Sequence, residues 1–316
     1  MMEPKPITVD VLNQFTQPDS TQVEHTLNEE LSRSTAKVVV LDDDPTGVQT
    51  VHGVPVYTNW DPDTLLEAFQ EPGRMFFILT NSRGMTAEVT AAEHERMAYA
   101  IHAAAQAADR PYILISRSDS TLRGHYPLET QTLRHTLEEL GEKPFDGEII
   151  YPFFMEGGRY TLNNIHYVQE GEQLIPAGLT EFAKDKSFGY KASSLPEWCV
   201  EKSGGTVCAQ DITCISLQNL CTCSYDDIER QLMAVHDFGK VIVNRISYEN
   251  VKVFSIVLLR AISKGKRFLL RSAAAVTKVL GGVPDRPLLT HKELILPGDR
   301  NGGIVIVGSH VNKTTA

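Results

Sequence analysis

Short apolar runs alternate with helical stretches along most of the chain, and this alternation limits the possible folds more than any other feature. The apolar runs are Val38–Leu41, Met75–Leu79, Tyr112–Ile115, Glu148–Tyr151, Val241–Val243 and Ile304–Val307. The sequence predicts helices over residues 61–70, 86–107, 127–140 and 247–264. Strands that alternate with helices form βαβ units. We therefore predict an α/β fold, with a three-layer α/β/α domain around a largely parallel sheet and the start of a second α/β domain.

Composition divides the chain into four parts. Residues 1–34 are polar without a clear period, which predicts an adaptable N-terminal extension, and residues 35–280 hold the predicted α/β domain. Residues 281–303 are dense in glycine and proline, as is typical of a linker. Residues 304–316 begin with a new apolar strand that no helix follows, so we expect them to be the first strand of a truncated second domain.

The net charge and the cysteines exclude several classes of protein. The 316-residue chain has a formal net charge of −10, which disfavours a nucleic-acid-binding surface and favours a small-molecule partner. We expect a cytoplasmic protein without membrane contact, because no segment resembles a signal peptide or a membrane-spanning helix. The five cysteines lie within residues 199–223 without a C-x-x-C pair, which argues against disulfides and structural zinc. The sequence leaves the oligomeric state open, and a homo-oligomer is compatible with it.

Three consecutive aspartates, Asp42, Asp43 and Asp44, follow the first predicted strand, and residues 45–47 then turn the chain. Ligands of open α/β sheets bind at the carboxyl ends of the strands. Adjacent carboxylates repel one another unless a cation, hydrogen-bond donors or solvent relieve them. The position at a strand end therefore indicates a functional site, and the alternative is a solvated acidic turn.

Later strand ends carry arginines and hydroxyl groups. Arg83 follows the second strand, Arg159 follows the fourth, and the loop after the third ends at a helix that begins near Pro127. The positive end of that helix dipole would add to the arginine charges. The candidate substrate-binding residues of these loops are Arg83, Arg117, Ser118, Asp119, Ser120, Arg123 and Arg159. With the aspartates they suit a small polyhydroxy acid, whose carboxylate would bind arginine and whose hydroxyls would bind aspartate.

Structural roles compete with these functional ones. The segment around Arg83 also fits a polar turn, and the one around Arg117 and Asp119 fits an internal salt-bridge loop. His166 lies in a more apolar stretch, where a histidine is more typical of packing than of ligand binding. In the functional interpretation, an aspartate placed against a hydroxyl acts as general base for phosphoryl transfer.

The first motif also fits a phosphatase of the haloacid dehalogenase type, which opens with D-x-D-x-T after a strand. Asp42 would then be the nucleophile and Asp44 the acid/base, with Mg²⁺ between them. Such a site needs a late acidic pair after another strand, but Val241–Val243 is followed by Asn244 and Arg245. We rank this interpretation second, and we predict no metal-ligating residue in the chain.

Six ordered motifs give the chain a specific resemblance to a known family. They are DDDPTGVQTVHG, TNSRG, SRSDSTLRGHYPLE, PFFMEGGRYTLNNIHYV, TEFAKDKSFGY and GSHVNKTTA. From about Val38 to the last residue, they resemble the four-carbon acid sugar kinase family. The resemblance implies ATP-dependent phosphorylation of tetronic acids such as threonate, erythronate or 3-oxo-tetronates. It also implies that the N-terminal α/β domain holds the acid sugar and that the C-terminal domain holds the nucleotide.

The resemblance implies roles for individual residues as well. Substrate contacts are implied at Asp43 or Asp44, at Arg83, and across residues 117–120, and a nucleotide contact is implied at Ser309. Asp43 and Asp44 are also the candidates for the catalytic base. The implied cofactor is ATP with Mg²⁺, but the glycine-rich phosphate-binding segments of the family are absent from this chain. We therefore expect the chain to bind a four-carbon acid sugar and to phosphorylate it poorly alone. The remaining alternative is a non-catalytic sugar-acid-binding module.

Overall fold

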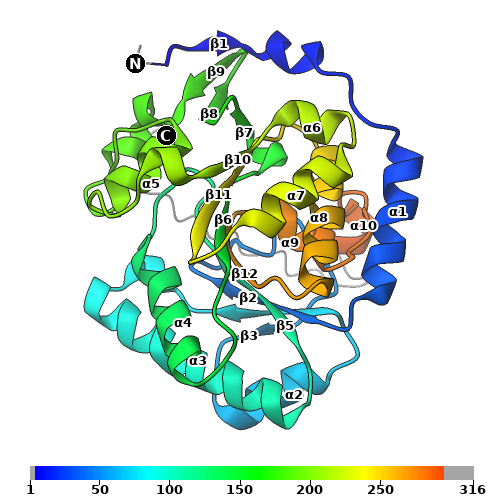
Figure 1. Cartoon of the computed structure of the whole chain (residues 1–316), viewed down its shortest axis with the longest axis vertical. Helices are drawn as coiled ribbons and strands as arrows, with labels where there is room; N and C mark the ends of the chain where they lie inside the picture. Colours follow the sequence, from blue (N-terminus) through cyan, green and yellow to red (C-terminus); the bar gives the residue numbers. More distant parts are fainter. Residues whose placement is uncertain (1–3, 295–316) are drawn as a thin grey trace. The chain divides into compact units, whose positions relative to one another are not determined.

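A parallel sheet of eight strands lies at the centre of the structure, a computed structural model that describes residues 4–294 (Figure 1). The chain divides into two units, Met1–Val283 and Pro284–Ala316, and the sheet belongs to the first. Every pairing within this sheet is parallel. In spatial order its strands are β10 (Thr213–Ile215), β11 (Gly239–Val243), β6 (Gly147–Tyr151), β12 (Phe268–Ser272), β5 (Tyr112–Arg117), β2 (Lys37–Asp42), β4 (Met75–Leu79) and β3 (Val56–Tyr57).

Strand β2 shows why the apolar runs become buried strands. It pairs with β5 on one side and β4 on the other, so its backbone hydrogen bonds are satisfied within the sheet. Its side chains alternate between the two faces, with Val38 and Val40 in one hydrophobic cluster and Val39 and Leu41 in the other. Because both faces are covered, a continuous apolar run is the favourable sequence for such a strand.

Helices cover both faces of the sheet, which confirms the predicted three-layer α/β/α architecture (Figure 1). One face packs against α2 (Pro62–Gln70), α3 (Ala87–Ala107) and α4 (Leu128–Glu139). The other packs against α1 (Ser20–Arg33), α6 (Leu217–Cys221), α7 (Tyr225–Ala234), α8 (Tyr248–Ser263) and α9 (Ala274–Leu280). A third cluster lies around α5 (Leu195–Lys202), and the second unit contains α10 (His291–Leu294).

The prediction of an adaptable N-terminal extension is wrong, because α1 packs into the main core. Val23, Leu27 and Leu31 recur every fourth residue and are at most 7% exposed. Glu30 on the same helix accepts a hydrogen bond from Arg260 Nε at 2.8 Å. Each such buried side chain contributes roughly 1.5–3 kcal/mol, so these residues hold the segment against α8. The spacing of the apolar residues is the signal that indicates the helix.

A second sheet of four antiparallel strands was not predicted. Its strands lie in the order β1 (Ile7–Thr8), β9 (Gln173–Pro176), β8 (Ile165–Glu170) and β7 (Arg159–Leu162). Strands β7 and β8 are joined by Asn163 and Asn164, both with positive φ, which is the conformation of a two-residue hairpin turn. A bridge between Thr161 and Arg245 connects β7 to the segment that follows β11.

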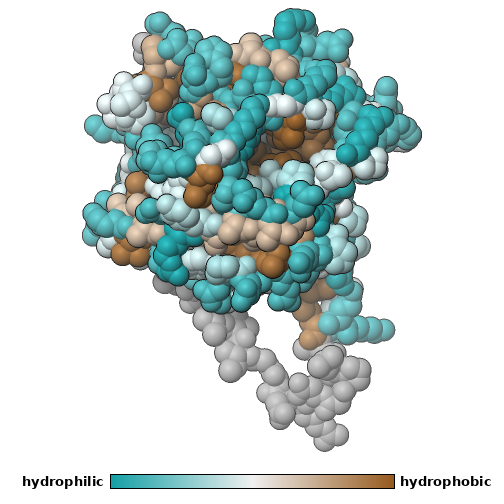
Figure 2. Space-filling model, turned by 60° about the horizontal axis from the view of Figure 1, so that its bottom comes forward, coloured by the Kyte–Doolittle hydropathy of each residue, from teal (hydrophilic) through white to brown (hydrophobic). Residues whose placement is uncertain are grey.

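The surface and the C-terminal predictions complete this description. Figure 2 shows a face on which hydrophilic residues predominate and hydrophobic ones form small scattered groups. Across residues 4–294, no helix is both long enough and apolar enough to cross a membrane. The predicted strand Ile304–Val307 and the second domain that it would begin lie outside the described residues.

Candidate functional site

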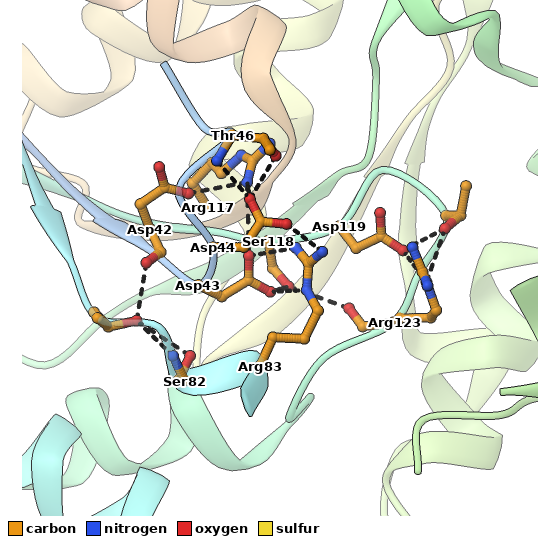
Figure 3. Close-up of polar contacts among 12 residues, drawn as sticks. Asp42, Asp43, Asp44, Thr46, Ser82, Arg83, Arg117, Ser118, Asp119 and Arg123 are labelled. Carbon is orange, nitrogen blue, oxygen red and sulfur yellow. Dashed lines mark hydrogen bonds and ion pairs between the residues drawn. The ribbon is translucent and has the colours of Figure 1, made fainter. Parts of the chain in front are cut away.

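Three neighbouring strands bring the aspartates and two of the predicted arginines together at one edge of the sheet (Figure 3). Asp42 is the last residue of β2, and Arg117, its partner in register, is the last residue of β5. Arg83 lies in a short 3₁₀ helix, Ser82–Gly84, just after β4. Because β4, β2 and β5 are adjacent and parallel, the loops at their carboxyl ends meet.

Arg83 binds the carboxylate of Asp43 with two hydrogen bonds. Its Nε lies 3.0 Å from Asp43 Oδ2 and its Nη2 lies 2.5 Å from Asp43 Oδ1, and its Nη1 forms an ion pair with Asp44. Arg117 lies on the other side of the cluster, where its Nη1 is 2.9 Å from Asp42 Oδ1 and 3.1 Å from Asp44 Oδ1. Two guanidinium groups therefore relieve the repulsion among three adjacent carboxylates.

The turn after the aspartates fixes their orientation. Asp44 Oδ1 accepts hydrogen bonds from the backbone N–H of Thr46 at 2.9 Å and from its hydroxyl at 2.5 Å. A Cβ atom on Gly47 would lie 1.8 Å from Asp42 Oδ2. Only glycine lets the chain turn this closely around the Asp42 carboxylate.

Burial separates the acidities of the three carboxyl groups. Burial raises the pKa of Asp42 to about 7, although the Arg117 charge opposes the shift. Burial also raises the pKa of Asp43, against the Arg83 charge. For Asp44, burial alone would raise the pKa, but the Arg83 guanidinium and the Thr46 hydroxyl bring it below its ordinary value. Near neutral pH the cluster therefore approaches zero net charge, with Asp44 ionised and Asp42 partly protonated.

The loop after β5 adds a second group of predicted residues beside this cluster (Figure 3). Ser118 Oγ donates a hydrogen bond to Asp43 Oδ2 at 2.5 Å. Arg123 Nε lies 2.6 Å from Asp119 Oδ2, and the guanidinium of Arg123 lies 5.1 Å from the centre of the Phe182 ring. Although burial opposes it, the Arg123 charge holds the pKa of Asp119 well below its usual range, so Asp119 is a carboxylate.

The last predicted residues lie where this loop meets the antiparallel sheet. The guanidinium of Arg159 lies 5.6 Å from the centre of the Phe182 ring, which it shares with Arg123. The backbone carbonyl of Ser120 lies 2.7 Å from His166 Nε2, and Thr161 Oγ1 lies 3.1 Å from His166 Nδ1. Burial lowers the pKa of His166 to about 3, so this ring is neutral and has the environment of a packing residue.

A cleft of about 590 Å³ borders the acidic cluster at Arg83. Its lining includes two further basic side chains, His125 and Lys202, and the first residues of α3 and α4, Ala87 and Leu128. Helix N-termini present free N–H groups and a partial positive charge. The cleft therefore offers a positive environment next to a set of hydroxyl-binding carboxylates.

The structure adds Arg271 to this edge of the sheet, a residue that sequence reasoning missed. It lies in β12, between β5 and β6, and is 3% exposed. Its Nη2 donates to the carbonyl of Arg123 at 2.9 Å. The signal in the sequence is the apolar run Phe268–Leu270 directly before Arg271 and Ser272, which matches the earlier pattern of a strand that ends in polar residues.

The three aspartates do not fit a magnesium site in this arrangement. They can place one oxygen each within 4.8 Å of one another, and they are the only such cluster of potential metal ligands within residues 4–294. However, all three carboxylates are already paired with Arg83 or Arg117, and a divalent cation would have to displace these guanidiniums. The phosphatase interpretation therefore loses its metal centre. Ser309, the predicted nucleotide contact, lies outside the described residues.

Solved structures share the fold. A domain of unknown function, DUF1537, from Bordetella bronchiseptica was solved in two crystal forms as a domain-swapped dimer with bound citrate. Both are 17% identical to this chain, with TM-scores of 0.56 and 0.58 over 77% and 78% of it. The chain covers 55% and 57% of these two structures, about half of their length. No curated protein matches the chain.

A family model described as the sugar-binding N-terminal domain matches residues 38–280. The matched range contains the acidic cluster, the arginines around it and Arg271, and it spans more than half of the chain. The chain therefore belongs to the sugar-binding N-terminal domain family, which confirms the resemblance to the N-terminal part of the four-carbon acid sugar kinases.

Proposed function

We propose that this chain supplies the substrate-binding part of an enzyme that phosphorylates a four-carbon acid sugar, of the threonate, erythronate or 3-oxo-tetronate class, with ATP. The observation that carries the proposal is the pair Asp43 and Asp44, held in fixed orientations by Arg83 and Arg117 beside a cleft with basic side chains. Carboxylates bind hydroxyl groups, and a cleft with basic side chains binds a carboxylate.

In this proposal Asp43 binds the hydroxyl that becomes phosphorylated. A hydroxyl attacks phosphorus only as it loses its proton, and Asp43 accepts that proton because its carboxylate is buried and its pKa is raised. Arg83 and Ser118 hold the carboxylate in place during this step. ATP with Mg²⁺ would supply the phosphoryl group, and this part of the proposal rests on the sequence motifs, since Ser309 is outside the described residues.

Two findings support the ligand class. The family model describes a sugar-binding domain, and the DUF1537 domain from Bordetella bronchiseptica holds citrate, which is itself a hydroxylated carboxylic acid. That protein is also a domain-swapped dimer, and we propose that this chain forms a homo-oligomer as well.

A thermal-shift screen tests the proposal. Ligand that binds only the folded state raises the melting temperature by mass action, by roughly 2.7 kcal/mol of stability at a hundredfold excess over Kd. We expect threonate, erythronate or a 3-oxo-tetronate to raise the melting temperature, and the neutral alcohols threitol and erythritol to have little effect. A parallel assay with p-nitrophenyl phosphate and Mg²⁺ covers phosphatase activity. Hydrolysis of that substrate, without any shift from the sugar acids, would contradict the proposal.

A further inference from the structure

Arg271 differs from the other arginines at the carboxyl edge of the sheet in its lack of a counter-charge. Arg83, Arg117 and Arg123 each form ion pairs with carboxylates. Arg271 is 3% exposed, and within residues 4–294 its one hydrogen bond is to the carbonyl of Arg123, while its Nε is buried without a partner. A buried charge is costly unless it is paired, so an unpaired guanidinium beside a cleft indicates a position for an anion.

Gly124 leaves open a space onto which Arg271 and the acidic cluster converge. A Cβ atom at this glycine would lie 3.3 Å from Arg271 Nη2, 3.3 Å from Asp43 Oδ2 and 2.5 Å from Ser118 Oγ. A cation, a carboxylate and a hydroxyl therefore surround one point. Gly124 also lines the cleft, so this point lies at the cleft wall. Its φ of 113° further favours glycine, which keeps the space free of a side chain.

The charges around the cleft favour an anion next to Arg271. Lys202 and His125 line the same cleft, and Gly124 separates it from the Arg271 guanidinium. Burial lowers the pKa of Lys202, and the positive charge of Arg271 contributes to that shift, which shows that the two charges influence each other. A carboxylate between these groups would relieve their repulsion.

We propose that Arg271 binds the carboxylate of the acid sugar, while Asp43 binds the hydroxyl on the carbon next to it. This inference rests on the proposed function and narrows its ligand to 2-hydroxy acids. Arg271 Nη2 and Asp43 Oδ2 each lie 3.3 Å from the same point, a spacing suited to two adjacent groups of one small molecule. Arg83 and Arg117 then hold the aspartates, and Arg271 is the cation that recognises the substrate.

The test compares threonate with threonamide, its neutral isostere, in calorimetric titrations of the wild type, Arg271→Met and Arg271→Lys. Because a charge-assisted hydrogen bond is lost, Arg271→Met should bind threonate about 10- to 100-fold more weakly and threonamide as the wild type does. Arg271→Lys keeps the charge and should retain part of the affinity for threonate. The matched control is Arg267→Met, at the opposite end of β12, where Arg267 pairs with Glu142; it should bind threonate as the wild type does.

The outcomes separate this inference from the proposed function. If Arg271→Met binds threonate as tightly as the wild type, or loses threonate and threonamide to the same extent, the assignment of Arg271 is wrong and the proposed function stands. If the wild type binds no sugar acid, both fall. Circular dichroism and the melting temperature of each variant establish that it is folded, and Arg271→Lys decides the matter if Arg271→Met is not.

Discussion

Replacing Asp42 by asparagine tests the electrostatics of the acidic cluster. Burial raises the pKa of Asp42 to about 7 in the folded protein, against the ordinary value of 3.8 that applies in the unfolded chain. Between these two values the folded state holds a proton that the unfolded state has lost. The free energy of unfolding therefore falls as pH rises through this window, and the full cost of ionising Asp42 is present above pH 7.

The size of the effect follows from the shift. About three pKa units at 1.36 kcal/mol each give an upper limit of roughly 4 kcal/mol. Water that enters the site would reduce this value, so we expect about 2–4 kcal/mol. Asp42→Asn removes the charge and keeps an oxygen that can accept the hydrogen bond from Arg117 Nη1, which is 2.9 Å long in the wild type.

Urea denaturation of both proteins at about pH 5 and about pH 8.5 measures the effect. His166 shifts stability in the opposite direction, because burial lowers its pKa to about 3 and its contribution is lost as pH falls below its ordinary 6.5. That contribution cancels in the difference between the two proteins. The difference should move in favour of Asp42→Asn by about 2–4 kcal/mol from the lower to the higher pH. The control, Asp10→Asn at an exposed position, should show no such movement, and an equal difference at both pH values for Asp42→Asn would refute the reasoning.

Two further substitutions test the packing of α1 and the pairing of the aspartates. Leu27→Ala, at a position 3% exposed, should lower the free energy of unfolding by roughly 2–5 kcal/mol in urea denaturation, and a loss within experimental error would mean that α1 does not belong to the core. Arg117→Met leaves the buried carboxylates with one guanidinium and should cost roughly 3–5 kcal/mol at pH 8. At pH 5 its cost should be smaller, because Asp42 is then protonated; a larger cost at pH 5 would contradict this account.

The general layout of the site could be predicted because parallel strands end at one edge. Asp42 and Arg117 end their strands, and Arg83 follows the third, so their proximity follows from the strand pattern alone. The pairings could not be predicted, because they depend on the strand order β4–β2–β5, which long-range packing decides. The sequence suggested arginines that face the substrate, whereas the structure uses Arg83 and Arg117 to neutralise the aspartates.

Arg271 and α1 were missed for local reasons. Strand β12 has only five residues, and alanines follow it, so its apolar run merges with the helical pattern of α9 and shows no clear boundary. In α1, polar and charged residues surround Val23, Leu27 and Leu31, and composition alone hides the apolar face. Such a face gains its stability from the partner on which it packs, here α8.

The most direct test of the central claim is a calorimetric titration of threonate into the wild type and into the double variant Asp43→Asn/Asp44→Asn. We predict saturable binding to the wild type and a loss of at least about 100-fold in affinity in the double variant, since two charge-assisted hydrogen bonds to the ligand are weakened. Circular dichroism should show that both proteins are folded, and Asp10→Asn should bind as the wild type does. Equal affinity in the folded double variant would contradict the assignment of Asp43 and Asp44 to the acid-sugar site.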